Sequence, residues 1–200
     1  MRTLRETLPR ILLTLALVAP LLAACAGHSS HRVDPSEDDE LGGTLIDSAD
    51  VIASTDRAAA ALAQSLLAMT NASIVVAPAT IKNESLQPFN TALLTDRLVD
   101  RLVGTTSPRV RFLAREQLDA VLREREAKRD GVYSKTEEKA LLGADFLLTG
   151  RIVSLSKRAD GDRADYFQMS FRLIDAESSE IVWADQYSFK KVGDAGVIYK

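Results

Sequence analysis

Cys25 is the only cysteine among the 200 residues, and its position predicts a defined chemical modification. It follows an uncharged run over residues 11–24 that ends in Leu22-Ala23-Ala24, and arginines outnumber acids before this run. A basic start, a short apolar segment and small residues at its end are typical of a secretory signal. A cysteine directly after Leu-Ala-Ala is typical of a bacterial lipobox, in which cleavage precedes the cysteine and its thiol receives a diacylglyceryl group. The sequence therefore predicts lipidation of Cys25.

The alternatives for this segment are an ordinary signal peptide with an incidental cysteine, or a weak membrane anchor. Fourteen helical residues cover about 21 Å, which is less than the ~30 Å hydrocarbon layer of a bilayer. Several acyl chains hold a protein at a bilayer surface without a spanning helix. Residue Ala26 is not aspartate, which favours the outer membrane over the inner one. We predict a signal peptide over residues 1–24 and a lipid-anchored location at the outer membrane, facing the periplasm.

Groups that commonly perform catalysis are scarce in the rest of the sequence. The only histidines, His28 and His31, lie close to Cys25, so residues 45–200 lack an imidazole base, a thiol nucleophile and a zinc-binding cluster. These residues contain no glycine-rich phosphate loop and no G-x-S-x-G motif. Aspartates and glutamates are numerous, but most are expected on helix exteriors or in turns. We predict a non-enzymatic protein with no cofactor, no metal and no small-molecule substrate.

Charge and composition argue against a nucleic-acid partner and separate a polar tether from a globular domain. The net charge is −3, and without residues 1–24 it is about −5. Nucleic-acid-binding proteins usually carry a concentrated basic face, so no nucleic-acid partner is expected. The segment after Cys25 is polar and contains the acidic cluster 37–40, and such a segment buries too little apolar surface to fold. We interpret residues 25–44 as a lipidated cysteine with a flexible acidic tether, and residues 45–200 as a globular domain.

The first half of the domain combines helical patterns with short β-branched runs. The third predicted helix carries Leu118, Val121 and Leu122 on one side, which we expect to face the core. Gly104 and Gly143 follow predicted helices and are expected to end them. The predicted helices span residues 54–69, 90–103, 115–131 and 135–142, and the predicted strands span residues 72–79 and 109–114, with a polar loop over residues 81–90.

The second half of the domain alternates with a period of two residues, which predicts β-strands. Three consecutive strands indicate an antiparallel meander over residues 145–158, 165–176 and 180–191. We therefore predict an α/β (α+β) two-layer sandwich, with a mixed sheet covered by helices on one face. The uncovered face is a candidate recognition surface. In the middle strand, the alternation assigns Phe167, Met169, Phe171 and Leu173 to the covered face and Tyr166, Gln168, Ser170 and Arg172 to the uncovered one.

Several stretches of the domain match the motifs of a known family. The most specific are "LLGADFLLTGRI" at 141–152 and "FRLIDAESSEIVWADQYSFKK" at 171–191, and "FLAREQLDAVLRERE" at 112–126 supports them. Over residues 48–192 the chain resembles the LpoB-type activators of penicillin-binding proteins, which are outer-membrane lipoproteins of Gram-negative bacteria. The family's hairpin commonly has a glycine where this chain has Ser179, so a left-handed backbone at this position would cost about 1 kcal/mol.

The resemblance implies a non-catalytic regulator that binds a class A penicillin-binding protein, a bifunctional peptidoglycan synthase, and stimulates it. The contact is expected on the polar face and turn of the C-terminal sheet, at Arg163, Tyr166 and Arg172, because Tyr and Arg often anchor interfaces. Alternatively, these are ordinary solvent-facing strand residues. The tether is shorter than in the best-known members, where it is long and proline-rich. The alternative function is a structural or assembly lipoprotein of an envelope machine, such as a secretion or flagellar complex.

Overall fold

The computed structural model describes residues 32–38, 43–69, 74–106, 108–134, 137 and 139–194. The chain divides into two units, residues 1–34 and residues 35–200, and the helices and strands named below belong to the second. The predicted signal peptide, Cys25 and both histidines lie outside the described residues. Within the predicted tether, residues 32–38, 43 and 44 are described. Residues 32–38 are exposed, whereas Thr44 is buried, so the last residue of the predicted tether belongs to the folded domain.

The elements of the domain follow the predicted order, with the helices and the short strands first and the long strands last. They are α2 (Ser48–Met69), β1 (Ile74–Pro78), β2 (Lys82–Glu84), α3 (Ala92–Thr105), β3 (Val110–Phe112), a 3-10 turn (Arg115–Gln117), α4 (Leu118–Arg129), β4 (Phe146–Ala159), β5 (Asp162–Asp175) and β6 (Ile181–Asp194).

The strands form one mixed sheet in the order β3-β1-β4-β5-β6, and β2 also pairs with β4. β1 is parallel to β3 and β4, whereas β5 runs antiparallel to both β4 and β6, which confirms the predicted meander. Residues 82–84, within the predicted polar loop, pair in parallel with β4 instead. Gly150 lies in an unbroken β4–β5 register, where an added Cβ would be 2.8 Å from the carbonyl oxygen of Ser170. Close packing therefore explains this strand glycine.

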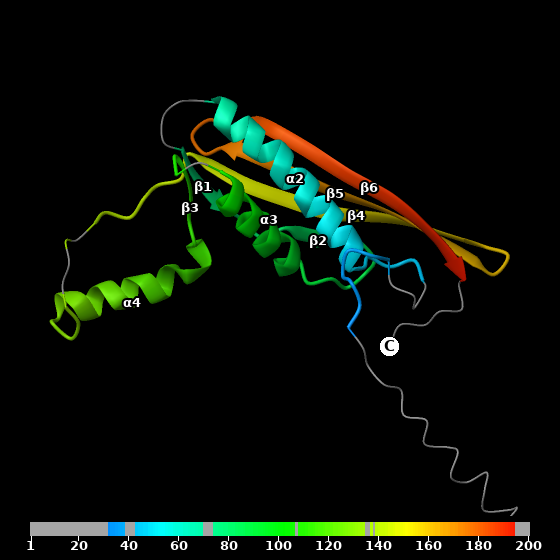
Figure 1. Ribbon diagram of the computed structural model, residues 1–200, viewed down its shortest axis with the longest axis horizontal. Helices are drawn as coiled ribbons and strands as arrows, with labels where there is room; N and C mark the ends of the chain where they lie inside the picture. Colours follow the sequence, from blue (N-terminus) through cyan, green and yellow to red (C-terminus); the bar gives the residue numbers. More distant parts are fainter. Residues whose placement is uncertain are drawn as a thin grey trace, which may run out of the picture. The chain divides into compact units, whose positions relative to one another are not determined.

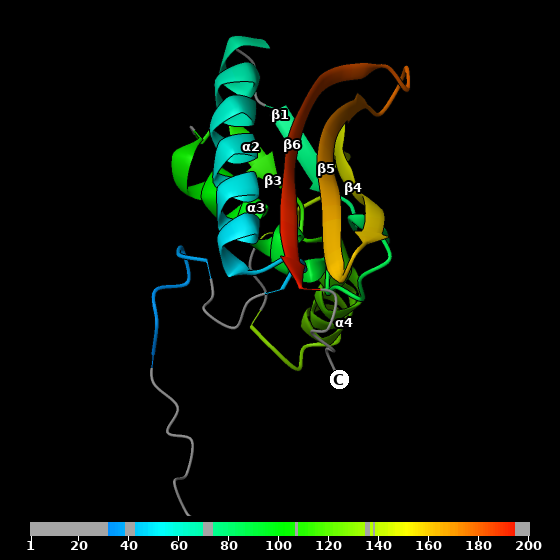
Figure 2. The same cartoon turned by 90° about the vertical axis from the view of Figure 1, so that its right-hand side faces the viewer.

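Two helices, α2 and α3, pack on the same face of the sheet (Figures 1 and 2). Their apolar residues recur every three or four positions, so each helix presents one continuous stripe to the strands. The predicted two-layer α+β architecture is confirmed. The most deeply buried large apolar side chains of the core come from α2 (Leu62 and Leu66), β1 (Val76), α3 (Leu94, Leu98 and Leu102), β4 (Ile152) and β5 (Phe167, Met169, Phe171 and Leu173).

The start of α2 lies six residues before its predicted start. Asp47 and Asp50 bind each other's backbone: the Asp50 N–H donates to Asp47 Oδ1 (3.0 Å), and the Asp47 N–H donates to Asp50 Oδ2 (3.1 Å). Such reciprocal bonds satisfy amide groups that a helix leaves unpaired at its first turn. The helix therefore begins at Ser48.

The predicted end of α3 at Gly104 was wrong, because the helix continues to Thr105. Its end is satisfied without a left-handed glycine. The Thr106 N–H donates to Leu102 O at 2.8 Å, and the Thr105 and Thr106 hydroxyls donate to the carbonyls of Arg101 and Leu102, both at 2.7 Å. Two side-chain donors thus replace the expected glycine cap.

The third predicted helix is present but does not pack on the core, and the fourth predicted helix is absent from the described residues. α4 is present, but none of its residues is buried, and Val121 and Leu122 are 42% and 41% exposed, so the expected core contacts were wrong. Figure 1 shows α4 lying apart from the sheet and from α2 and α3. The helix predicted over 135–142 was also wrong, since residues 137 and 139–142 are irregular. A helix of this length is marginal in water without a buried face.

Candidate functional site

The outward face of the β4–β5–β6 meander is the first candidate surface. Tyr166, Gln168, Ser170 and Arg172 alternate with the buried residues of β5, as predicted, and Arg172 is exposed. Tyr166 Oη donates to Gln168 Oε1 at 3.3 Å, and Gln168 Nε2 donates to Ser170 Oγ at 3.2 Å. A file of hydrogen-bonded side chains therefore runs along β5. Arg172 follows Ser170 on the same side of β5, and at the rise of a β-strand it lies about 20 Å from Tyr166.

Tyr166 and Arg172 have different neighbours on the adjacent strands. Tyr166 lies between Leu155 of β4 and Lys190 of β6, and Leu155 is 70% exposed. Arg172 lies between the small side chains of Thr149 and Ala184, which leaves its guanidinium group accessible. We call the outward residues of these strands the open face. It offers an aromatic and aliphatic contact at one end and a cation at the other, which suits the binding of another macromolecule.

The third predicted contact residue, Arg163, does not lie on the open face. It shares the inward side of β5 with Asp165, and Arg163 Nε lies 2.7 Å from Asp165 Oδ2. Asp165 is fully buried and also accepts a hydrogen bond from the Thr44 hydroxyl. Burial opposes ionisation of Asp165, but its polar contacts with Ser156, Thr44 and Arg163 outweigh burial and lower the pKa of this carboxyl. Arg163 therefore neutralises a buried carboxylate, and the structure brings only Tyr166 and Arg172 together on one face.

A second charged cluster, which the sequence did not reveal, fixes the start of α2 to the end of β6. Lys191 Nζ lies 2.6 Å from Asp47 Oδ2 and 2.7 Å from Asp50 Oδ2. Burial raises the pKa of Asp50, whereas the hydrogen bonds from Lys191 and from the backbone overcome burial at Asp47 and lower its pKa. The pattern Asp47-x-x-Asp50 is a capping signal that sequence reasoning could have used.

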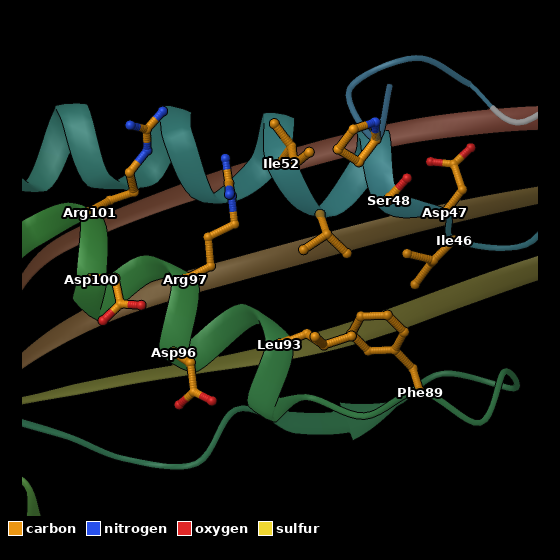
Figure 3. A pocket seen from close by; sticks show the side chains of 12 residues that line it. Ile46, Asp47, Ser48, Ile52, Phe89, Leu93, Asp96, Arg97, Asp100 and Arg101 are labelled. Atoms are coloured by element: carbon orange, nitrogen blue, oxygen red, sulfur yellow. The ribbon is translucent and has the colours of Figure 1, made fainter. Parts of the chain in front are cut away.

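A groove of ≈640 Å³ between α2 and α3 is the second candidate surface (Figure 3). One end is apolar, and the other carries charged residues of α3. Arg97 and Arg101 point toward α2, where both bind Asp56, at 3.1 Å and 2.7 Å, and the hydrogen bond from Arg101 lowers the pKa of that carboxyl. The apolar end is lined by Ile46, Val51, Ile52, Phe89 and Leu93.

Two negative findings limit what these surfaces can do. Among the described residues, no three His, Cys, Asp or Glu side chains gather in the way that a metal site requires. None of the helices in the described part of the chain combines the length and apolar character needed to cross a membrane.

Comparison with known proteins gives one family match. The sequence model of the family described as "Peptidoglycan-synthase activator LpoB" matches residues 50–189. No curated protein sequence matches the chain.

Among solved structures, the chain is similar to the C-terminal domain of LpoB from Escherichia coli, with 17% identity, a TM-score of 0.39, and 64% of this chain and 93% of that one covered. The NMR structure of E. coli LpoB gives 13% identity and a TM-score of 0.39 over 84% of this chain and 77% of that one. Lipoprotein GNA1162 from Neisseria meningitidis gives 13% identity and a TM-score of 0.38 over 60% and 83% of the two chains.

Proposed function

Because the chain belongs to the peptidoglycan-synthase activator family LpoB, whose sequence model matches residues 50–189, we propose that it is a lipid-anchored regulator of a class A penicillin-binding protein. The family match supports the resemblance seen in the sequence and is the observation that carries this proposal. The protein performs no chemistry itself on this view. It binds a bifunctional peptidoglycan synthase and raises the rates of its reactions.

Activation by binding has a simple thermodynamic requirement. A regulator shifts a synthase toward its active conformation only if it binds that conformation more tightly than the inactive one. A rigid, preformed surface strengthens binding to the conformation that it fits, because little side-chain entropy is lost on contact. The hydrogen-bonded file from Tyr166 to Ser170 supplies such rigidity on the open face. We assign the synthase contact to this face, with Tyr166 and Arg172 as its anchors.

The anchor at Cys25 sets where the domain works. Lipidation of Cys25 after removal of residues 1–24 would hold the protein at the outer membrane and leave the domain facing the periplasm. Eighteen residues of tether span at most about 60 Å when fully extended. The part of the synthase that binds the domain must therefore lie no farther from the anchoring membrane than the extended tether and the domain together can span.

The test uses the native lipoprotein, purified in detergent from membranes, and a panel of class A synthases. We expect at least one synthase to be retained by the protein in a pull-down and to polymerise lipid II faster in its presence. Mass spectrometry of the same material is expected to show an acylated N-terminal residue at position 25. No binding and no change of rate across the panel would contradict the proposed function, and an intact, unacylated N-terminus would contradict the anchor alone.

A further inference from the structure

α4 and the turn after it expose apolar side chains that the domain core does not use. Leu122 is 41% exposed, Val132 68% and Tyr133 52%. The helix is only twelve residues long and has no buried residue. Its C-terminal end is well formed, since Gly131 adopts a φ of 77° and the Val132 N–H donates to Ala127 O at 2.9 Å. An isolated helix of this length is marginal in water, so α4 is stabilised by any surface that covers it.

α3 carries an exposed stripe on the side opposite its core residues. Leu93 and Val103 are 57% and 58% exposed, and Asp96 and Asp100 lie between them on the same side. Within the part of the chain that the structure describes, neither aspartate forms an ion pair, whereas the neighbouring arginines of α3 bind Asp56. The stripe therefore presents two uncompensated negative charges between two apolar ends.

α4 carries the complementary stripe at the same spacing. On α3, Asp100 lies three residues before Val103, and Asp96 lies four residues before Asp100. On α4, Arg125 lies three residues after Leu122, and Arg129 lies four residues after Arg125. Helix residues three and four apart lie on one face, so the stripes match when the helices run antiparallel. The matched pairs are Leu122 with Val103, Arg125 with Asp100 and Arg129 with Asp96.

The apolar ends of the two stripes also meet in this arrangement. Beyond Arg129 the chain continues to Val132 and Tyr133, and beyond Asp96 the α3 stripe continues to Leu93. Leu93 lies at the apolar end of the α2–α3 groove, beside Phe89 (Figure 3). An antiparallel α4 therefore brings two exposed apolar side chains to a groove that has room for them.

In the structure, α4 of the same copy lies apart from α3 (Figure 1). β3 follows α3 after a short connection, and residues 113–117 then lie against the middle of α3, where they line a cavity with Thr95, Asp96, Val99 and Asp100. The chain therefore enters α4 from the middle of α3, whereas an antiparallel α4 must start beside the C-terminal end of α3. We propose that α4 of one copy of this protein lies antiparallel along α3 of a second copy, with Val132 and Tyr133 at the α2–α3 groove. This contact leaves the open face of both copies accessible.

A photo-crosslinking experiment on the full chain in cells identifies what covers α4. The photoreactive amino acid p-benzoylphenylalanine replaces Leu122, and in a matched control it replaces Gln186, which is exposed on the open face. We expect the Leu122 position to give a crosslinked dimer, with the crosslink mapped by mass spectrometry to residues 92–106 of the second copy. The proposal is overturned if the crosslink joins α4 to α3 of the same copy or to another protein, or if the control position gives the same dimer.

Charge reversal tests the two predicted ion pairs. Asp96→Arg with Asp100→Arg makes both stripes basic, and Arg125→Asp with Arg129→Asp makes both acidic. Each variant alone is expected to lose the Leu122 crosslink about tenfold, because like charges then face each other. Coexpression of the two variants, carrying different tags, should restore a mixed dimer to the wild-type level. Unchanged melting of each purified variant shows that folding is intact, and failure of the mixed pair to recover would refute the antiparallel arrangement.

Discussion

Lys191 of β6 and Asp47 at the start of α2 form an ion pair of 2.6 Å, although 144 residues separate them in the sequence. Asp50, the third residue of α2, shares the same ammonium group at 2.7 Å. Asp50 is only 6% exposed. One lysine therefore compensates two carboxylates and joins the first helix of the domain to its last strand.

Replacing Lys191 with methionine is expected to destabilise the domain by about 2 kcal/mol. The change keeps most of the side-chain volume but leaves Asp47 and Asp50 facing each other without a cation in a largely buried site. Urea unfolding followed by circular dichroism measures the effect. Lys190→Met is the matched control, since Lys190 is exposed on the open face. Equal stability of the two variants would show that the ion pairs contribute nothing.

Acid is expected to weaken the domain through Asp165. Its pKa is lowered in the folded state, against about 3.9 in an unfolded chain, so the unfolded chain binds the proton more tightly. The carboxylate therefore stabilises the fold above about pH 4, and this contribution is lost as the pH falls through the lowered pKa. Asp165→Asn should reduce stability by about 2 kcal/mol at pH 7 and flatten the decline below pH 5. Asp162→Asn, at an exposed site of the same strand, should retain the wild-type slope.

Ser179→Gly is expected to stabilise the turn between β5 and β6. Ser179 has a φ of 64°, a left-handed conformation that glycine adopts without a steric penalty. The gain is about 1 kcal/mol, or a rise of roughly 3 °C in Tm for a domain of this size. Ser178→Gly provides the contrast, because Ser178 Oγ donates to Asp175 Oδ1 at 3.1 Å, and its loss should lower Tm. Calorimetry measures Tm, which should rise for Ser179→Gly and fall for Ser178→Gly.

Two glycine-to-alanine substitutions should have opposite effects. At Gly150 the new methyl group would be 2.8 Å from Ser170 O and 3.2 Å from Ile81 Cγ1, so the β4–β5 pair must shift, at a cost of about 2 kcal/mol. At Gly104, inside α3, nothing lies within 4 Å, and alanine should stabilise the helix by about 0.5–1 kcal/mol. Denaturant midpoints of both variants, measured side by side, test the contrast.

The open face should respond to substitution in binding but not in folding. Tyr166→Ala with Arg172→Glu is expected to weaken synthase binding at least tenfold, since an aromatic anchor and a cation are both lost. Surface plasmon resonance with the synthase retained in the pull-down measures the change. Arg158→Glu, at an exposed position near the β4–β5 turn, is the matched charge control and should bind as the wild type does. Full affinity of the double variant would exclude this face as the contact.

The alternating strands were predictable because a period of two residues leaves little choice. Phe167 to Leu173 face the core and Tyr166 to Arg172 face outward, as the pattern indicates. The same alternation places Arg163 on the inward side with Asp165, so the sequence pattern itself separates Arg163 from Tyr166. β2 was missed because a run of Lys-Asn-Glu has low strand propensity, and only its place beside β4 makes it a strand.

The helices show what a sequence pattern does not predict, namely the surface that covers an apolar side. Leu118, Val121 and Leu122 repeat like core positions, but the pattern records only that one side of α4 is apolar, and it does not say what covers that side. The Lys191 cluster was invisible for another reason, since its members are brought together only by the complete sheet. Local periodicity thus predicted the layers, whereas contacts between distant segments required the structure.

The junction of residues 43–50 with β5 and β6 has a mechanical consequence. A pull on the chain upstream of residue 43 reaches Thr44, held at Asp165, and then Asp47, held at Lys191, before it reaches the first turn of α2. The load passes into the long strands instead of peeling the helix away from them. The contacts of Thr44 and Asp47 are therefore the first ones that bear a force applied at the leading end of the domain.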